Sequence, residues 1–176
     1  MLFAVRGTMV AATVAWAVGE IGIRSSRRRE RPAPESSVAV WRWARRFWTV
    51  GVVLALVHAW LAFEYVYDWS HTVAADETLR LATSRIGVGW AGGIYVNYVF
   101  LAVWMADVCW WWLSPASHAG RGRRLETSRR AFFLFMFLNG SVVFASGASR
   151  IIGAIAVGSV LAGSVYTWRV RSGASL

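Results

Sequence analysis

The sequence predicts an all-α polytopic integral membrane protein, a bundle of about five transmembrane helices with a short interfacial helix before the second. Of its 176 residues, 57% are hydrophobic and only 16% are charged, a composition that suits a water-soluble surface poorly. The apolar residues form blocks long enough to span the hydrocarbon core of a bilayer. All 19 basic residues are arginines, and most lie between these blocks. We therefore expect residues 1–176 to form a single transmembrane domain.

The first span is expected at residues 2–23, followed by an arginine-rich cytoplasmic linker at 24–46. Pro32 and Pro34 make the first part of this linker an extended, solvated connection. A cleaved secretory signal is the alternative for the first span, but the arginines that follow it argue against export of the rest.

Residues 38–48 (VAVWRWARRFW) predict the interfacial helix. On a helix, the aromatic and aliphatic side chains here separate from Arg42, Arg45 and Arg46, which is typical of a helix at the level of the lipid head groups. This helix is expected to bend into, or continue as, the second span at 47–67.

The third span is expected at 87–113, where Ser114 and Pro115 end it. A second arginine-rich cytoplasmic linker follows at 114–130. Spans four and five are expected at 131–148 and 151–170, joined in a tight hairpin through Ser149 and Arg150.

The distribution of arginine predicts the orientation. Fifteen of the 19 arginines fall in the two linkers and the C-terminal tail. Because cytoplasmic loops retain the excess of positive charge, we expect the N-terminus outside and the C-terminus inside a cell membrane, most naturally a bacterial-type inner membrane. The arginines expected to contact anionic lipid head groups are Arg27, Arg28, Arg29, Arg42, Arg45, Arg46, Arg123 and Arg124.

Many of the 12 tryptophans fall at the ends of the expected spans, as an aromatic belt would. Trp48 and Trp111 are assigned to the inner belt by this argument. Trp16, Trp60 and Trp104 are left inside spans, to face lipid, a neighbouring helix or a bound ring.

Polar side chains within spans are costly and therefore mark candidate sites. His58, Asn97 and Asn139 fall at similar depths in spans two, three and four, and could meet in one layer. In span three, a seam of residues follows a 4-3 spacing typical of helix packing: Gly93, Asn97, Phe100, Trp104, Asp107 and Trp111. A matching seam through Leu54, His58, Leu61, Tyr65 and Asp68 in span two would bring His58 within reach of Asn97.

Two interpretations of this pair stay open. His58 could bind haem, a quinone, a pigment or a metal, or carry a proton, with Asn97, Trp60 and Trp104 lining the site. Alternatively, the two polar side chains only hold their helices in register. A bis-histidine haem is disfavoured because His71 and His118 fall outside the spans.

Further acidic groups suggest two other sites. If the second helix continued outward, Glu64, Asp68 and His71 would share one face and could bind a divalent cation. Glu20 and Asp107 lie near the inner side, where Arg46, Arg129 or Arg130 could pair with them.

No catalytic motif is recognised, so enzymatic activity is not expected, and the identity of any cofactor stays open. Since the arginines flank apolar spans, nucleic acid is not expected as a partner. Small residues in spans three and five permit close contacts with other membrane subunits or a second copy. The expected role is an accessory, assembly or structural subunit of a membrane complex. The alternatives are a haem-, quinone- or pigment-binding subunit of an electron-transfer complex, and a small transporter or channel built on His58, Asn97 and Asn139.

Overall fold

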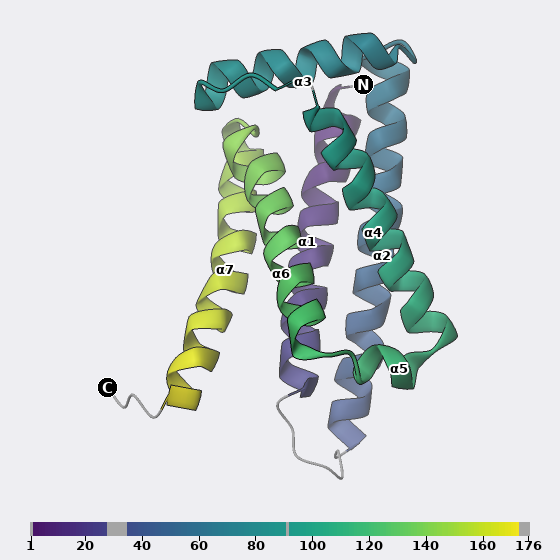
Figure 1. Cartoon of the computed structure of the whole chain (residues 1–176), viewed down its shortest axis with the longest axis vertical. Coiled ribbons are helices and arrows are strands. Elements are labelled where there is room, and N and C mark those ends of the chain that lie inside the picture. Colours follow the sequence, from purple (N-terminus) through teal and green to yellow (C-terminus); the bar gives the residue numbers. More distant parts are fainter. Residues whose placement is uncertain (1, 28–34, 91, 173–176) are drawn as a thin grey trace.

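The computed structural model describes residues 2–27, 35–90 and 92–172, and all regular structure in these ranges is helical. The bundle consists of α1 (Leu2–Arg27), α2 (Glu35–Tyr65), α4 (Gly93–Leu113), α6 (Arg123–Leu138) and α7 (Gly147–Ser172). Helix α3 (His71–Ile86) lies across one end of the bundle, and the short helix α5 (Pro115–Ala119) lies at the other (Figure 1). We name these the α3 end and the arginine-rich end.

Among the described residues, three helices are long and apolar enough to cross a membrane: Val38–Tyr65 within α2, Gly93–Leu113 (α4) and Gly147–Tyr166 within α7. They correspond to the expected second, third and fifth spans. Helices α1 and α6 lie where the first and fourth spans were expected, but they are not among these three helices. In α6 the charged residues extend to Arg130. The uncharged stretch 131–143 that follows covers only about 20 Å along the helix axis.

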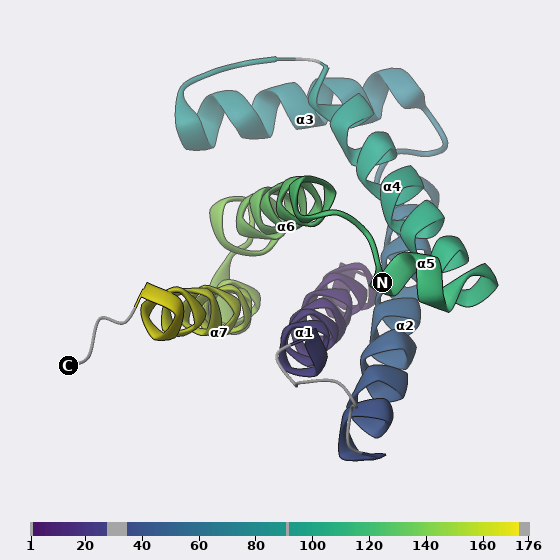
Figure 2. The ribbon, with the colours of Figure 1, turned by 60° about the horizontal axis from the view of Figure 1, so that its bottom comes forward.

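Of the two alternatives for residues 38–48, the structure has the second: they continue directly into the second span, and α2 runs without a break from Glu35 to Tyr65. A separate interfacial helix is therefore not formed. The first half of α2 packs against α1 instead of lying apart from the bundle. The Cβ of Ala44 on α2 is only 2.8 Å from where a Cβ on Gly22 would lie. Glycine at this position lets the two backbones approach closely, and α1 in turn lies between α2 and α7 (Figure 2).

Helix α3 forms in the segment between the expected second span (47–67) and third span (87–113), where a loop was expected. Its start is capped by Ser70, whose hydroxyl accepts a hydrogen bond from the amide of Val73 at 3.3 Å. Its end is capped by Gly87 in the left-handed conformation, with φ of 71°. Asp68 and Trp69 also have positive φ, and these two residues turn the chain from the end of α2 into α3.

The connection between α6 and α7 differs from the expected hairpin. A π-helical turn, η1 (Asn139–Val143), extends α6, and the chain reverses before Gly147, whose φ is 59°. Ser149 and Arg150 therefore belong to the first turn of α7. The guanidinium of Arg150 donates to the carbonyl of Val142 at 2.7 Å, which satisfies a carbonyl at the end of η1.

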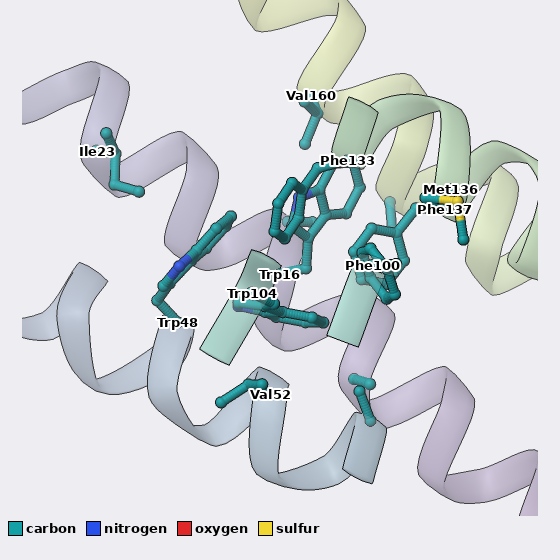
Figure 3. Packing of buried hydrophobic residues seen from close by; sticks show 14 of the residues in the cluster. Trp16, Ile23, Trp48, Val52, Phe100, Trp104, Phe133, Met136, Phe137 and Val160 are labelled. Carbon is teal, nitrogen blue, oxygen red and sulfur yellow. The ribbon is translucent and has the colours of Figure 1, made fainter. Parts of the chain in front are cut away.

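The core is built largely from aromatic rings (Figure 3). Trp16 stacks on Phe137, with centroids 4.3 Å apart, and Trp48 lies 5.0 Å from Phe133. The large side chains that are fully buried include Trp16, Trp48, Trp104, Trp111, Phe133 and Phe137. The assignment of Trp48 and Trp111 to an interfacial belt is therefore wrong, because both pack inside the bundle.

Candidate ligand cavity beneath helix α3

A cavity of about 690 Å³ lies at the α3 end of the bundle. Its walls come from α1, α2, α4, α6, η1 and the start of α7, and α3 contributes Glu77, Thr78, Leu81, Ala82 and Ile86. Most of the lining side chains are aliphatic or aromatic. This size and lining are those of a site for a small molecule, since such sites measure about 300–1,000 Å³ and contain a few polar groups.

His58 is half-buried on α2 and lines this cavity. Its Nδ1 lies 2.9 Å from the carbonyl oxygen of Val5 on α1. Because a carbonyl oxygen can only accept, Nδ1 carries the ring proton and donates it. In the neutral ring, Nε2 then has the lone pair, and no other described residue hydrogen-bonds to it. His58 can therefore accept a hydrogen bond from a ligand.

Asn97 on α4 and Asn139 on η1 line the same cavity. The three polar residues of the expected layer thus come to one place, but His58 bonds to Val5 and not to Asn97. Asn139 donates to the carbonyl of Phe135 at 2.8 Å. The seam expected on span two is also incorrect: Tyr65 is exposed, and the residues that α2 buries are Ala44, Trp48, Val52, Ala55 and Ala62.

The two tryptophans expected beside His58 do not line the cavity. Trp60 is 50% exposed on the outside of the bundle, whereas Trp104 is fully buried. The Trp104 ring packs against Trp48 and Phe133, with centroids 5.5 Å and 5.4 Å away. Neither indole can contact a molecule held by His58 in this structure.

The structure does not bring Glu64, Asp68 and His71 together as a metal site. Helix α2 ends at Tyr65, so the continuous helical face that would align them is absent. Glu64 instead accepts a hydrogen bond from the indole of Trp69 at 2.9 Å. Within the described ranges, no group of three histidine, cysteine or acidic side chains could hold a metal ion.

Charged residues occur at the edge of the cavity. Arg6 on α1 and Glu77 on α3 both line it. Glu77 binds the guanidinium of Arg80 through hydrogen bonds of 2.7 Å and 2.6 Å. The hydrogen bond with Arg80 lowers the pKa of Glu77, against a smaller opposing effect of burial. Glu77 is therefore an ionised carboxylate that already has a cation.

A second polar cluster is buried at the arginine-rich end, away from the cavity. Arg121 binds Asp107 at 2.8 Å and also contacts Glu126. Arg129 bridges Glu126 at 3.0 Å and Glu20 at 2.8 Å. Burial alone would raise the pKa of Glu126, but Arg129, Arg121 and Arg130 hold it well below its usual range. These carboxylates and guanidiniums join α1, α4 and α6.

The expectation that Glu20 pairs with Arg129 and Arg130 is confirmed. Asp107 pairs instead with Arg121 and lies 3.3 Å from Nε2 of His118. His118 was expected in a loop, yet it is fully buried and stacks on Trp111.

The arginines expected to bind lipid head groups fall into three groups. Arg42, Arg46, Arg123 and Arg124 are exposed, as that role requires. Arg45 is partly buried, with its guanidinium 3.9 Å from the ring centroid of Trp112. Arg28 and Arg29 lie outside the described residues, as does the side chain of Arg27.

The sequence did not indicate Glu126 as part of the buried cluster or Arg6 as part of the cavity lining. Glu126 precedes Arg129 and Arg130 by three and four residues, a spacing that favours ion pairs on a helix and could have identified it. No local signal marks Arg6, because the cavity beside it is formed by segments distant in sequence. No protein family, curated protein or solved structure matches this chain.

Proposed function

We propose that the protein is an integral membrane protein that binds a lipophilic small molecule with a polar head in the cavity beneath α3. The observation that carries the proposal is the cavity of about 690 Å³, whose lining is mostly apolar and includes the polar side chain of His58. Fixed by the Val5 carbonyl, the His58 ring offers Nε2 as an oriented acceptor. The proposed function corresponds to the ligand-binding alternative that the sequence left open, and it includes no catalytic activity.

The proposed setting is a bilayer crossed by α1, α2, α4, α6 and α7, with the α3 end outside and the arginine-rich end in the cytoplasm. Helix α3 would then lie in the outer interface, and ligand would reach the cavity from that side of the membrane. The excess of arginine at the opposite end supports this orientation.

The role of accessory or assembly subunit stays a prediction, as does binding to other membrane subunits, to a second copy or to anionic lipid. The transporter alternative has one observation in its favour, since a cavity at the α3 end is lined by His58, Asn97 and Asn139. The mostly apolar lining favours a lipophilic occupant over an ion, which would require a polar path.

Filling the cavity tests the proposal. Ala59 lines the cavity, whereas Leu56 is exposed on the same helix and does not line it. We expect purified wild-type protein to retain a lipophilic molecule that solvent extraction and mass spectrometry identify. Ala59→Phe should lose it, because the ring occupies the space, while the control Leu56→Phe should keep it.

His58→Gln adds a second measurement, because its amide can still donate to Val5 but the imidazole Nε2 is gone. We expect a similar melting temperature to wild type with less bound ligand. An absorbance spectrum identifies haem or pigment if either is the occupant. The proposal fails if equal amounts of every extracted lipid accompany wild type and Ala59→Phe.

A further inference from the structure

We propose that the ligand of this cavity is a single-chain amphiphile with an anionic head group, and that Arg6 binds this head group. The inference rests on the proposed function and names the chemical class of the ligand. A carboxylate or a phosphate monoester would supply the same chemistry, since both accept two hydrogen bonds from one guanidinium.

The charged side chains of the cavity favour an anionic ligand. Arg6 and Glu77 are the charged residues in its lining. Glu77 is neutralised by Arg80 through two hydrogen bonds. Arg6 is exposed, so it lies at the rim of the cavity, and its side chain forms no ion pair or hydrogen bond with any other described residue. The edge of the cavity therefore has one unbalanced positive charge, which an anionic ligand would neutralise.

Arg6 and His58 lie close to each other along the bundle axis. Arg6 follows Val5 directly, and the carbonyl of Val5 binds the His58 ring. Because consecutive residues are only about 1.5 Å apart along a helix axis, the backbone of Arg6 lies at nearly the same height as the imidazole on the neighbouring helix. Both residues line the cavity. The guanidinium can bind two oxygens of either head group. Nε2 of His58 can accept from the P–OH of a singly protonated phosphate, whereas an ionised carboxylate has no proton to donate to it.

The remaining lining suits one hydrocarbon chain. On α1 the cavity extends from Val5 to Thr13, about 12 Å along the helix axis. Met9 and Val10 line it there, and Ala55 of α2 and Leu101 of α4 line it as well. A cavity of about 690 Å³ falls within the range for small-molecule sites, which favours one acyl chain over the two chains of a phospholipid.

Binding to delipidated protein in detergent, followed by native mass spectrometry, tests the inference. The probes are palmitic acid, palmitoyl lysophosphatidate, hexadecanol and a short-chain ubiquinone. We expect one or both anionic probes to bind at least about tenfold more tightly than the alcohol and the quinone, the effect of one charge-assisted interaction. Binding of only one anionic probe would identify the head group as carboxylate or phosphate.

Three variants make the test specific to Arg6. Arg6→Gln should reduce binding of the anionic probes to the level of the alcohol, and Arg6→Lys should restore part of it. Arg85→Gln removes the same charge from an exposed position on α3 outside the cavity lining, and should leave binding unchanged. Melting temperatures would confirm that each variant is folded.

The outcomes separate the inference from the proposed function. If alcohol or quinone binds as tightly as the acids, or if Arg6→Gln and Arg85→Gln behave alike, the anionic ligand is wrong while a lipophilic ligand stands. If none of the four probes binds to wild type and no lipid is extracted from it, the proposed function itself fails.

Discussion

His118 shows how a single residue gains a role from its surroundings. Its ring stacks on Trp111, with centroids 4.5 Å apart and an interplanar angle of 13°. Nε2 lies 3.3 Å from Asp107, and Arg121 contacts the same nitrogen. Burial lowers the pKa of His118, and Arg121 adds to this, while the hydrogen bond with Asp107 opposes it. The folded protein therefore favours the neutral ring.

This lowered pKa predicts a pH-dependent stability. The unfolded chain takes up a proton near the ordinary value of about 6.5, before the folded protein does. Stability due to His118 is therefore complete above this pH and is lost as the pH falls below it. We expect the melting temperature in detergent to decrease between about pH 7.5 and 5.5, and to decrease less in His118→Gln.

His71 provides the control, because it is exposed at the start of α3. His71→Gln should retain the pH dependence of wild type. A His118→Gln protein whose melting temperature follows pH as steeply as wild type would show that other groups cause the acid sensitivity.

At the scale of elements, glycine determines how closely helices pack. A Cβ on Gly153 of α7 would lie 2.2 Å from the carbonyl oxygen of Ser141 in η1, whereas a Cβ on Gly158 would meet nothing within 4 Å. Ser141 in turn hydrogen-bonds Thr13 of α1 at 2.7 Å. Gly153 therefore permits the contact between α7 and η1 that also positions Ser141 against α1.

Alanine at these two positions should have opposite effects. Gly153→Ala forces α7 away from η1, and overpacking of this kind costs about 1–3 kcal/mol. Gly158→Ala should be neutral or stabilising by up to about 1 kcal/mol, because alanine is the better helix former and the space is open. Thermal unfolding of both proteins in the same detergent measures the difference. Equal melting temperatures would contradict the close packing at Gly153.

Helical spacing predicted the packing of the second half of α4 better than that of α2. The part of the expected seam through Phe100, Trp104, Asp107 and Trp111 is buried, because this row contains two of the four tryptophans of α4 and its only carboxylate. The outer part of the seam is not buried, since Asn97 is exposed and Gly93 is only partly buried. Helix α2 has apolar residues on every side of its second half, so spacing alone could not select the row through Val52 and Ala55. That choice depends on the shape of α1 and α4.

At the scale of the whole molecule, the sequence predicted the order of the bundle helices but not the cavity. Order follows from apolar blocks and arginine clusters, which are local in sequence. The cavity depends on α3, and α3 was missed because residues 71–86 are too polar to resemble a span. The caps at Ser70 and Gly87 were the signal that could have revealed it.

The number of spans is the remaining prediction at this scale, and single cysteines can determine it. Cys109 is the only cysteine, so Cys109→Ser provides a background without thiols. Ser84 and Ser146 are exposed at the α3 end, and Ser25 and Ser117 are exposed at the arginine-rich end. Each is replaced by cysteine and treated with a membrane-impermeant maleimide in intact cells.

Five spans require the two ends of the bundle to lie on opposite sides of the membrane. Cysteine at 84 or 146 should react in intact cells, and cysteine at 25 or 117 only after permeabilisation, since the arginine-rich end is expected inside. If cysteine at 146 behaves like that at 117, α6 does not cross the bilayer, because these positions flank it. If cysteine at 25 reacts from outside, α1 does not cross. Either result would also move the cavity, and with it Arg6, to a different depth in the membrane.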